Sequence, residues 1–457
     1  MALLLVGNGP VLTFTNPPQV FENGAVLIDQ ATGLITAVGA TEDLKKAHPT
    51  ATFLDAAGKL IMPGLICAHT HFYSMFSRGM PLKDEPGHTF MEVLQRLWWR
   101  LDKALEAEDN YLSAAVSVLS AIRCGCTTVI DHHASPSSIK GSLDELARAT
   151  LAGGIRACLC YEVTDRNGHQ GAVDGIDENM RFIRRCATEQ NPLLAAAMGL
   201  HASFTVTEDT LTATANALRR GAPFPASMGG IHIHVAEDHF DADHCMSEYR
   251  ESPIQRLMRH GLLGERSLCS HCVHVSAADR ALLGQTNTMV VHNPSSNMNN
   301  AVGLPAVQEM LSQGILLGLG TDGMSHDMVG EYKSLYLAHK LEHRNPQQMG
   351  GTDAAKMLFN NNAQIASRFF GFPIGVLAPG AVGDLVLLDY HNPTQLNPGN
   401  FPWHMMFGMS VGDVDTTIVA GKILMQGHRI NPAVVQLNEQ EIFARCRARC
   451  PGVWARF

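Results

Sequence analysis

The chain has 457 residues, of which 46% are hydrophobic and 17% are charged, and its formal net charge at pH 7 is −9. This composition is typical of a folded protein with a core and excludes a largely disordered chain. The negative balance and the lack of a long basic block argue against a nucleic-acid partner held through its phosphates. Because no apolar run is long enough to cross a bilayer, we also expect no membrane partner.

The expected compartment follows from the N-terminus and the cysteines. The first residues, MALLLVGNGP, lack the basic segment of a signal peptide. Eleven cysteines, an odd number for a disulfide framework, are scattered through apolar segments. We therefore expect reduced thiols in a cytoplasmic protein.

In chain order, the first segments look like short strands separated by turns. They read ALLLVGN, VLTFT, GAVLIDQ and LITAVGA, and the same texture returns near the other end in VGDLVLLDY and DTTIVAGKILMQGHRI. β-Branched residues bounded by Gly, Asn and Asp are typical of strands. Neither set is large enough for a stable sheet alone, so we expect residues 1–59 and 375–435 to form one composite β-sandwich domain.

The segment between them, residues 60–374, alternates short apolar runs with longer helical patterns. Eight runs fit strands, and they start near residues 60, 126, 155, 193, 230, 267, 288 and 315. Repeated βα units predict an α/β fold with a parallel sheet, and eight of them favour a closed (β/α)8 TIM-like barrel. A doubly wound open sheet is the alternative, but no G-x-G-x-x-G follows the first run.

Three further segments complete the expected organisation. Residues 292–300, HNPSSNMNN, are expected to form a polar, turn-rich loop on the same rim as the other strand ends. Residues 392–404, rich in Pro and Asn, predict a surface crossing. Residues 436–457 predict a C-terminal helix or tail with a solvated basic face.

The first run ends in PGLICAHTHF, which places His69 and His71 one residue apart. Residues two apart on a strand point to the same side, and the C-terminal ends of barrel strands carry the active site. His69 and His71 should therefore converge there. Two converging neutral imidazoles are a metal-ligand arrangement, although an isolated H-x-H also fits two half-buried histidines bonded to backbone.

Other predicted strands end in the same residue types. The fourth run ends at His201, the fifth carries His234 and Glu237 in HIHVAE, the sixth ends at His271, and the eighth ends at Asp322. In a barrel these side chains share one rim, and histidine and aspartate bind zinc or iron(II). The sequence therefore predicts a metal centre at this rim.

These motifs resemble the amidohydrolase superfamily, and more narrowly its aminohydrolase and chlorohydrolase branch, which includes guanine deaminase. The resemblance lies in PGLICAHTHF, HVAE, GTDG and VLAPGAVGDLVLLD with its later VAGK. Within this branch, the overall sequence pattern is most similar to that of SsnA-type aminohydrolases. The resemblance implies a metal-dependent hydrolase that is a homodimer and acts on a small heterocyclic substrate.

The resemblance also implies roles for individual residues. The implied metal ligands are His69, His71, His234 and Asp322. The implied catalytic residues are Glu237, His271 and Asp322, and His201 matches a substrate contact. The fourth run, LLAAAMGLH, lacks the lysine that bridges two metals in binuclear members. The resemblance therefore implies one divalent ion per subunit, with Zn²⁺ expected and Fe²⁺ as the alternative.

The chemistry expected from such a centre is hydrolysis. A divalent ion makes hydroxide available from water near neutral pH, Asp322 can accept a proton, and Glu237 can carry it to a ring nitrogen. We expect cleavage of a C–N bond of a purine-like heterocycle, and the favoured hypothesis is deamination in purine catabolism. The alternatives are a ring-opening cyclic amidohydrolase, a chlorohydrolase, and a non-enzymatic binding protein on the same scaffold.

Several nearby residues keep weaker or open roles. Gln95, in FMEVLQRLWWRLD, is a candidate substrate contact, although the segment also fits an amphipathic helix. His232 fits a core histidine better than a ligand. His132 and His133 fit either supporting residues or plain rim residues, and His326 is expected near the entrance.

Overall fold

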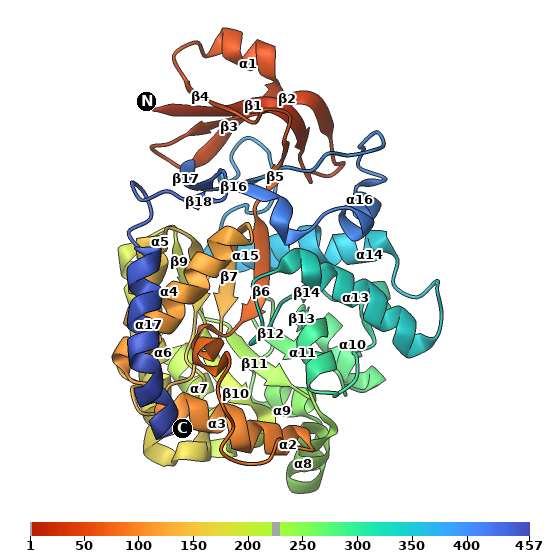
Figure 1. The fold of residues 1–457 in the computed structure, drawn as a ribbon. Helices are drawn as coiled ribbons and strands as arrows, with labels where there is room; N and C mark the ends of the chain where they lie inside the picture. The colour runs from red at the N-terminus through yellow and green to blue at the C-terminus, as the bar shows by residue number, and fades with distance from the viewer. Residues whose placement is uncertain (1, 222–228) are drawn as a thin grey trace.

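The structure, a computed structural model, describes residues 2–221 and 229–457. The described strands form one nine-stranded sheet and two parallel sheets. Figure 1 shows the nine-stranded sheet above the parallel strands, which helices surround. None of the described helices is both long and apolar enough to span a bilayer.

The nine-stranded sheet contains strands from both ends of the chain, as the sequence predicts. Its order is β18-β17-β16-β15-β5-β1-β2-β3, with β4 paired to β1. The two ends meet where β15 pairs antiparallel with β5, from Leu385 opposite Pro63 to Leu388 opposite Leu60. The strands are β1 (Leu3–Leu12), β2 (Val20–Asp29), β3 (Leu34–Ala40), β4 (Thr52–Asp55), β5 (Leu60–Pro63), β15 (Leu385–Leu388), β16 (Val414–Val419), β17 (Lys422–Gln426) and β18 (Arg429–Ile430).

All eight predicted apolar runs contain strands of the parallel sheets. One sheet holds β6 (Leu65–Thr70), β7 (Cys126–Asp131), β8 (Arg156–Leu159) and β9 (Leu194–Ala196). The other holds β10 (Met198–Ala202), β11 (Ile231–Val235), β12 (Leu268–His271), β13 (Met289–His292) and β14 (Leu317–Leu319). Most of these strand residues are buried, as expected where helices cover a parallel sheet.

The fourth run is divided between the two sheets at Ala197, because β9 pairs with β8 while β10 pairs with β11. Single bridges link the sheets at both edges, between Thr70 and Asp322 and between Val163 and Leu200. The α/β class with parallel strands is therefore confirmed. Strand pairing among the described residues gives two linked sheets rather than one closed barrel sheet.

The side-chain amide of Asn362 strengthens one of these links. Its nitrogen donates to the carbonyls of Ile66 and Leu319, both at 2.8 Å, and its oxygen accepts from the Leu319 amide at 2.8 Å. A buried amide that satisfies three backbone groups holds β6 beside β14. This contact brings the end of the first strand next to the end of the last one.

Helices follow most parallel strands and cover their outer sides. Serine caps begin α9 and α10, where Ser252 and Ser276 accept from the third helical amide. The helices are α1 (Thr41–Ala47), α2 (Phe90–Val93), α3 (Trp99–Ala104), α4 (Ala107–Arg123), α5 (Ser142–Gly153), α6 (His169–Glu189), α7 (Glu208–Gly221), α8 (His239–Tyr249), α9 (Pro253–Arg259), α10 (Ala277–Gln285), α11 (Pro294–Asn299), α12 (Val307–Ser312), α13 (Met328–His343), α14 (Gly351–Ala355), α15 (Asn362–Phe370), α16 (Phe401–Phe407) and α17 (Glu439–Arg456).

Two segments expected to be irregular contain short helices. Residues 292–300 contain α11, and residues 392–404 lead into α16. In both helices a proline occupies the first turn, where its missing N–H costs no hydrogen bond. Asn and Ser favour turns in isolation, so tertiary contacts decide the conformation of α11.

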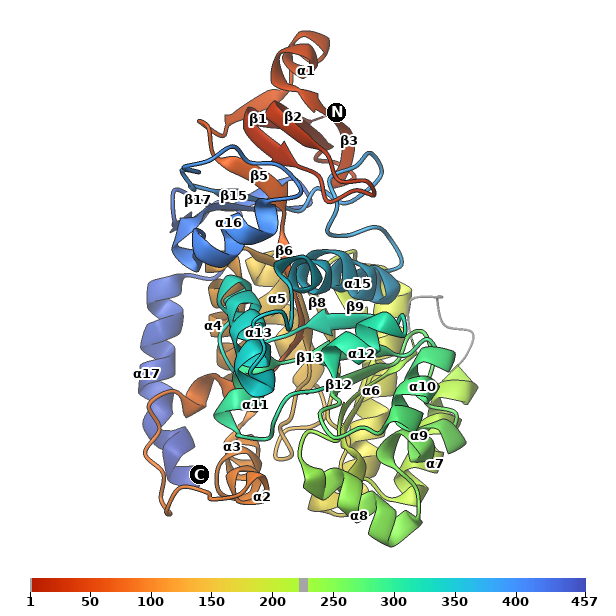
Figure 2. The same cartoon turned by 90° about the vertical axis from the view of Figure 1, so that its right-hand side faces the viewer.

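The basic face of α17 is paired rather than simply solvated, which corrects the expectation for the C-terminal helix. Arg449 and Arg456 contact Asp109 at 2.8 and 2.6 Å, and Arg445 contacts Glu108. These acids lie in the first turn of α4, where negative charge is favourable. Figure 2 shows α17 in blue running along the side of the molecule.

A buried ion pair joins the parallel strands to the nine-stranded sheet. Arg156 of β8 donates to both carboxylate oxygens of Asp384, at 2.7 and 3.2 Å, and both side chains are 1% exposed. Asp384 also accepts from the backbone amide of Ala420 at 2.8 Å. Removal of one partner from such a pair lowers the stability of the fold strongly, because the other charge stays buried without a counter-ion.

We expect Asp384→Ala to lower the free energy of unfolding by about 3–5 kcal/mol, because it leaves the Arg156 guanidinium buried without its counter-ion. Urea-induced unfolding measures the change. The control is Glu145→Ala, which removes the partner of the half-exposed Arg148 and should cost less than about 1 kcal/mol. Equal losses in the two variants would contradict the assignment.

Candidate metal centre

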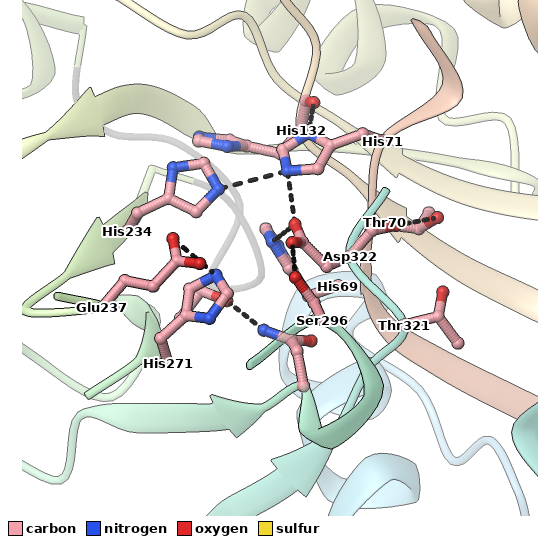
Figure 3. A network of polar contacts seen from close by, with 12 residues as sticks. His69, Thr70, His71, His132, His234, Glu237, His271, Ser296, Thr321 and Asp322 are labelled. Atoms are coloured by element: carbon pink, nitrogen blue, oxygen red, sulfur yellow. Dashed lines mark hydrogen bonds and ion pairs between the residues drawn. The ribbon is translucent and has the colours of Figure 1, made fainter. Parts of the chain in front are cut away.

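Five side chains from four strand ends converge at one edge of the parallel sheets. His69 lies in β6 and His71 directly follows it, His234 lies in β11, His271 ends β12, and Asp322 follows β14. Figure 3 shows these side chains pointing toward one another. The strand-end pattern read from the sequence is therefore realised in space.

The backbone fixes Asp322 against the first strand. The Asp322 amide donates to the His69 carbonyl at 3.0 Å, and the His71 amide donates to the Asp322 carbonyl at 3.2 Å. Asp322 and His271 have φ values of 55° and 69°, in the left-handed region that favours glycine. Positions of this kind persist only where the surroundings hold them, and they cluster at functional sites.

The ligand-type atoms lie at distances suited to one metal ion. Asp322 Oδ1 is 3.2 Å from His69 Nε2 and 2.8 Å from His71 Nε2, and the Nε2 atoms of His71 and His234 are 3.2 Å apart. Ligands bonded to zinc at 2.0–2.2 Å are about 3.3–3.6 Å apart in tetrahedral geometry. One ligand-type atom from each of His69, His234, His271 and Asp322 also lies within 4.8 Å of the others.

The tautomers of two histidines show why a cation fits here. His71 Nδ1 donates to the His132 carbonyl at 2.5 Å, and His234 Nδ1 donates to the His201 carbonyl at 2.7 Å. A carbonyl only accepts, so each neutral ring carries its proton on Nδ1 and a lone pair on Nε2. The two lone pairs face each other at 3.2 Å and cannot bond to each other. A metal ion satisfies both, so the residues present fit a divalent metal.

The charge state of the cluster supports the same conclusion. Burial holds the pKa of His234 well below its usual value and lowers that of His69 to about 4. Burial would also lower the pKa of His71, but the Asp322 carboxylate outweighs it and raises that pKa to about 9. Burial would raise the pKa of Asp322, yet His71 and His69 hold it well below its usual value. The ionised Asp322 carboxylate therefore attracts positive charge, which is the extra proton of His71 when no metal is bound and the metal ion when it displaces that proton, while His69 and His234 are neutral.

Glu237 and His271 lie beside the cluster as an acid–base pair. Glu237 Oε2 is 3.5 Å from His271 Nε2, and Glu237 Oε1 accepts from the Asn300 amide at 3.1 Å. Burial, followed by the nearby Asp322 charge, raises the pKa of Glu237 well above its usual value. Asn297 donates to His271 Nδ1 at 3.0 Å, which places the proton of the neutral ring on Nε2. Glu237 can therefore hold and transfer a proton at this position.

A cavity opens onto this cluster. Trp98, Trp99 and Phe204 form an aromatic part of its wall, and Glu162 and Asp102 form an acidic part. Pockets that bind small organic ligands have apolar walls for contact and a few polar groups for orientation, as this lining does. The cavity therefore suits a planar, polar molecule held against the cluster.

Of the two predicted substrate contacts, one lines this cavity. His201 does so, with its Nε2 atom 3.8 Å from Glu162 Oε2. Gln95 lines a neighbouring groove with Trp99 and Arg166 instead. Gln95 lies in a π-helical turn, η2 (Leu94–Trp98), whose wider turn shifts side chains off the face that α-helical spacing predicts.

The histidines with open roles are all buried. His232 Nε2 is 2.8 Å from His69 Nδ1, so it orients the His69 ring, and His132 Nε2 donates to the His232 carbonyl at 3.0 Å. His133 Nε2 is 2.9 Å from the hydroxyl of Ser135. His326 is 1% exposed and is not among the described residues that line the cavity, so the expectation of an entrance position is wrong.

The sequence did not single out several polar groups of the site. Ser296 donates to Asp322 Oδ2 at 2.5 Å, and Asn297 and Asn300 contact His271 and Glu237. All three come from α11 or the residue after it. Glu162, in CYEV at the end of the third predicted run, has the same strand-end position as the histidines.

Comparison with known proteins agrees with this geometry. Residues 60–424 match the Amidohydrolase family. The chain belongs to this family. The amidohydrolase is 30% identical to a 5'-deoxyadenosine deaminase of Methanosarcina mazei, over 100% of this chain and 99% of the relative. It is 29% identical to a 5-methylthioadenosine/S-adenosylhomocysteine deaminase of Pelotomaculum thermopropionicum, over 98% of each chain.

A solved structure shares the fold of this amidohydrolase. It is an adenosine deaminase from Xanthomonas campestris with bound zinc, with a TM-score of 0.81 and 21% identity, over 97% of this chain and 98% of that one. The predicted superfamily and branch are confirmed, as is the enzyme class, a hydrolase acting on carbon–nitrogen bonds other than peptide bonds. In this chain, His69, His234, His271 and Asp322 form a cluster that could hold a metal ion.

We expect His69→Ala to lower the metal content of the purified protein by about tenfold or more, because even residues that only support a ligand change metal affinity by that much. Elemental analysis after equilibration with a limiting zinc concentration measures the content. The control is His391→Ala, since the His391 side chain is 96% exposed. A full metal complement in the His69 variant would overturn its place in the cluster.

Proposed function

We propose that this amidohydrolase deaminates an amino-substituted, purine-like heterocycle and releases ammonia. The observation that carries the proposal is the position of Glu237, whose raised pKa lets it hold a proton beside the metal cluster and the cavity. The relatives support it, since both are named as deaminases of adenosine derivatives. Deamination needs a proton at the ring and at the departing amine, which a carboxyl group of this kind can supply.

We propose His69, His71, His234 and Asp322 as the ligands of one divalent ion. Three neutral imidazoles and one carboxylate suit Zn²⁺, with Fe²⁺ as the alternative. When bound, the ion supplies Lewis acidity that makes hydroxide available from water near neutral pH. No lysine lies in β9 or β10, which supports a single ion.

The chain's own residues then divide the remaining work. Asp322 accepts the proton of the attacking water, while Ser296 donates to its other oxygen at 2.5 Å and fixes its orientation. Glu237, held by Asn300, delivers a proton to the ring nitrogen beside the reacting carbon. The proton taken up by Asp322 then passes to the amine as its C–N bond breaks, and the hydroxyl proton of the adduct returns to Glu237 as the carbonyl forms. His271 presents its Nε2 proton toward Glu237 and toward the oxygen that adds to the ring. Trp98 and Phe204 of the cavity wall orient the ring and exclude water.

The products distinguish the proposed reaction from the two alternative hydrolyses. Ammonia release from a panel of aminopurines and related rings would support deamination. Loss of ring absorbance without ammonia would indicate a ring-opening cyclic amidohydrolase, and chloride release would indicate a chlorohydrolase. The zinc-loaded protein is the sample to use, with a chelated sample as the blank.

Other features of the whole protein are also proposals. We propose that the two linked parallel sheets act as one (β/α)8 barrel over residues 60–374, and that the nine-stranded sheet folds into the small β-sandwich domain of residues 1–59 and 375–435. Residues 436–457 would be the C-terminal segment. A cytoplasmic homodimer acting in purine catabolism fits the resemblance, and all eleven cysteines are free thiols. Sedimentation measures the assembly.

We expect Glu237→Gln to keep the wild-type metal content and to lower kcat for ammonia release by about 10²–10⁴-fold, because the amide cannot transfer a proton. Elemental analysis and a coupled ammonia assay give the two readouts. Glu342→Gln, on the exposed side of α13, is the matched control and should retain full activity. Undiminished turnover in the Glu237 variant would rule out its role as proton carrier.

A further inference from the structure

Glu162 is a buried carboxylate in the cavity wall that the proposed chemistry does not use. It follows β8, is 2% exposed, and lines the same cavity as His71 and Glu237. A buried carboxylate without hydrogen-bond donors is costly, and a ligand that brings donors relieves that cost. The groups around Glu162 therefore indicate what the cavity is built to hold.

Three histidine nitrogens lie nearest to this carboxylate. Oε1 is 3.3 Å from His132 Nδ1 and 3.4 Å from His71 Nδ1, and Oε2 is 3.8 Å from His201 Nε2. The His71 Nδ1 proton is already given to the His132 carbonyl at 2.5 Å. His132 Nε2 donates to the His232 carbonyl, so the neutral His132 ring has a lone pair on Nδ1. In agreement, Glu162 Oε1 and His132 Nδ1 are both buried without a hydrogen-bond partner.

The same reasoning applies to His201 on the other side. Its Nδ1 is 2.8 Å from the Thr205 hydroxyl, which itself donates to the Ala202 carbonyl at 3.0 Å. The neutral His201 ring therefore donates through Nδ1 and turns a lone pair on Nε2 toward Glu162. The neutral His132 and His201 rings thus turn lone pairs toward the carboxylate, and the His71 proton is shared with the His132 carbonyl, so further donors for Glu162 must come from the cavity.

A second buried acid in the wall has the same requirement. Asp102 is 2% exposed, and its Oδ2 accepts from Arg166 at 2.8 Å, but its Oδ1 has no hydrogen-bond partner. The indole N–H of Trp99, also in the wall, is an unpaired donor. None of the described residues that line the cavity is Lys or Arg. The wall therefore suits a ring with N–H donors and a carbonyl, and disfavours phosphorylated or carboxylated molecules.

We propose that Glu162 is a specificity-determining residue whose carboxylate accepts hydrogen bonds from ring N–H groups of the substrate. The favoured substrate class is an amino-substituted heterocycle in the lactam form, with N–H and C=O side by side, over rings whose edge carries only acceptors. Because Glu162 lies within 3.8 Å of His71 and His201, the part of the substrate beside it is the reacting ring rather than a distant substituent. This inference rests on the proposed deaminase function.

Kinetics of Glu162→Gln test the proposal on zinc-loaded protein. The substrates are guanine, its ring N-methyl derivatives, and 5'-deoxyadenosine, whose purine ring has no N–H. We expect wild type to prefer guanine, and the variant to lose about 10–100-fold in kcat/KM for guanine, mainly through KM. Methylation at the contacted nitrogen should cost wild type a similar factor and cost the variant little, which is the non-additivity of a direct contact. Additive losses, or a wild-type preference for 5'-deoxyadenosine, would overturn the proposal.

A binding measurement keeps this test separate from the deaminase proposal. Zinc-loaded Glu237→Gln, with and without Glu162→Gln, is titrated calorimetrically with xanthine and N-methylxanthines, so no turnover is needed. Coupling between Glu162 and a ring N–H would support the inference even if no amine is released, whereas ammonia release without coupling would overturn the inference alone. Coupling instead to the sugar hydroxyls of 5'-deoxyadenosine would also overturn the assignment to the ring.

Two controls exclude a structural explanation. Glu178→Gln removes another buried carboxylate, on α6, where it pairs with Arg181 outside the cavity; it should not change substrate preference. Metal content of Glu162→Gln should equal that of wild type. Loss of the ion would instead make Glu162 a ligand together with His71, His132 and His234, whose ligand-type atoms also lie within 4.8 Å of one another, and would overturn the proposal.

Discussion

The site depends on imidazole lone pairs and a carboxylate that face one another at one edge of the parallel sheets and require a positive charge between them. Lone pairs of His71 and His234 face each other at 3.2 Å, and the Asp322 carboxylate lies 2.8 Å from the first of them. Such an arrangement is unfavourable in a buried setting unless positive charge enters it. A divalent ion removes the repulsion, so the cluster and its ion stabilise each other.

The fold keeps this arrangement from relaxing. Asp322 is tied by backbone hydrogen bonds to the strand that carries His69 and His71, and Asn362 holds the underlying strands together. Behind the cluster, His232 orients the His69 ring, and the carbonyls of His132 and His201 fix the rings of His71 and His234. Side chains held this way cannot turn away from one another, so the proposed metal site is preorganised.

The sequence alone predicts the cluster because two simple rules apply to it, one on side-chain alternation along a strand and one on where parallel strands end. Alternation along a strand puts His69 and His71 on one side, and parallel strands put their C-terminal ends on one edge. These two rules sufficed to bring together the histidines, Glu237 and Asp322. They did not reach Ser296, Asn297 and Asn300, because a short helix rich in Asn and Ser looks like a turn until its side chains bind the site.

Other misses have equally local causes. The π-helical turn around Gln95 shifts the face that α-helical spacing predicts, and one wide turn leaves no signal in the sequence. The division of the fourth run at Ala197 into two paired segments is set by neighbouring strands rather than by its own residues. The position of Glu162 at a strand end could have been predicted, since it resembles that of the histidines. A single carboxylate, however, forms no recognisable motif with its neighbours in the sequence.

Anomalous X-ray diffraction at the zinc edge, on crystals of the zinc-loaded protein, tests the central claim most directly. The account predicts one strong peak within about 2.0–2.2 Å of His69, His71, His234 and Asp322. A peak displaced toward Glu162 and His132, two peaks of equal height, or no peak at the cluster would contradict it.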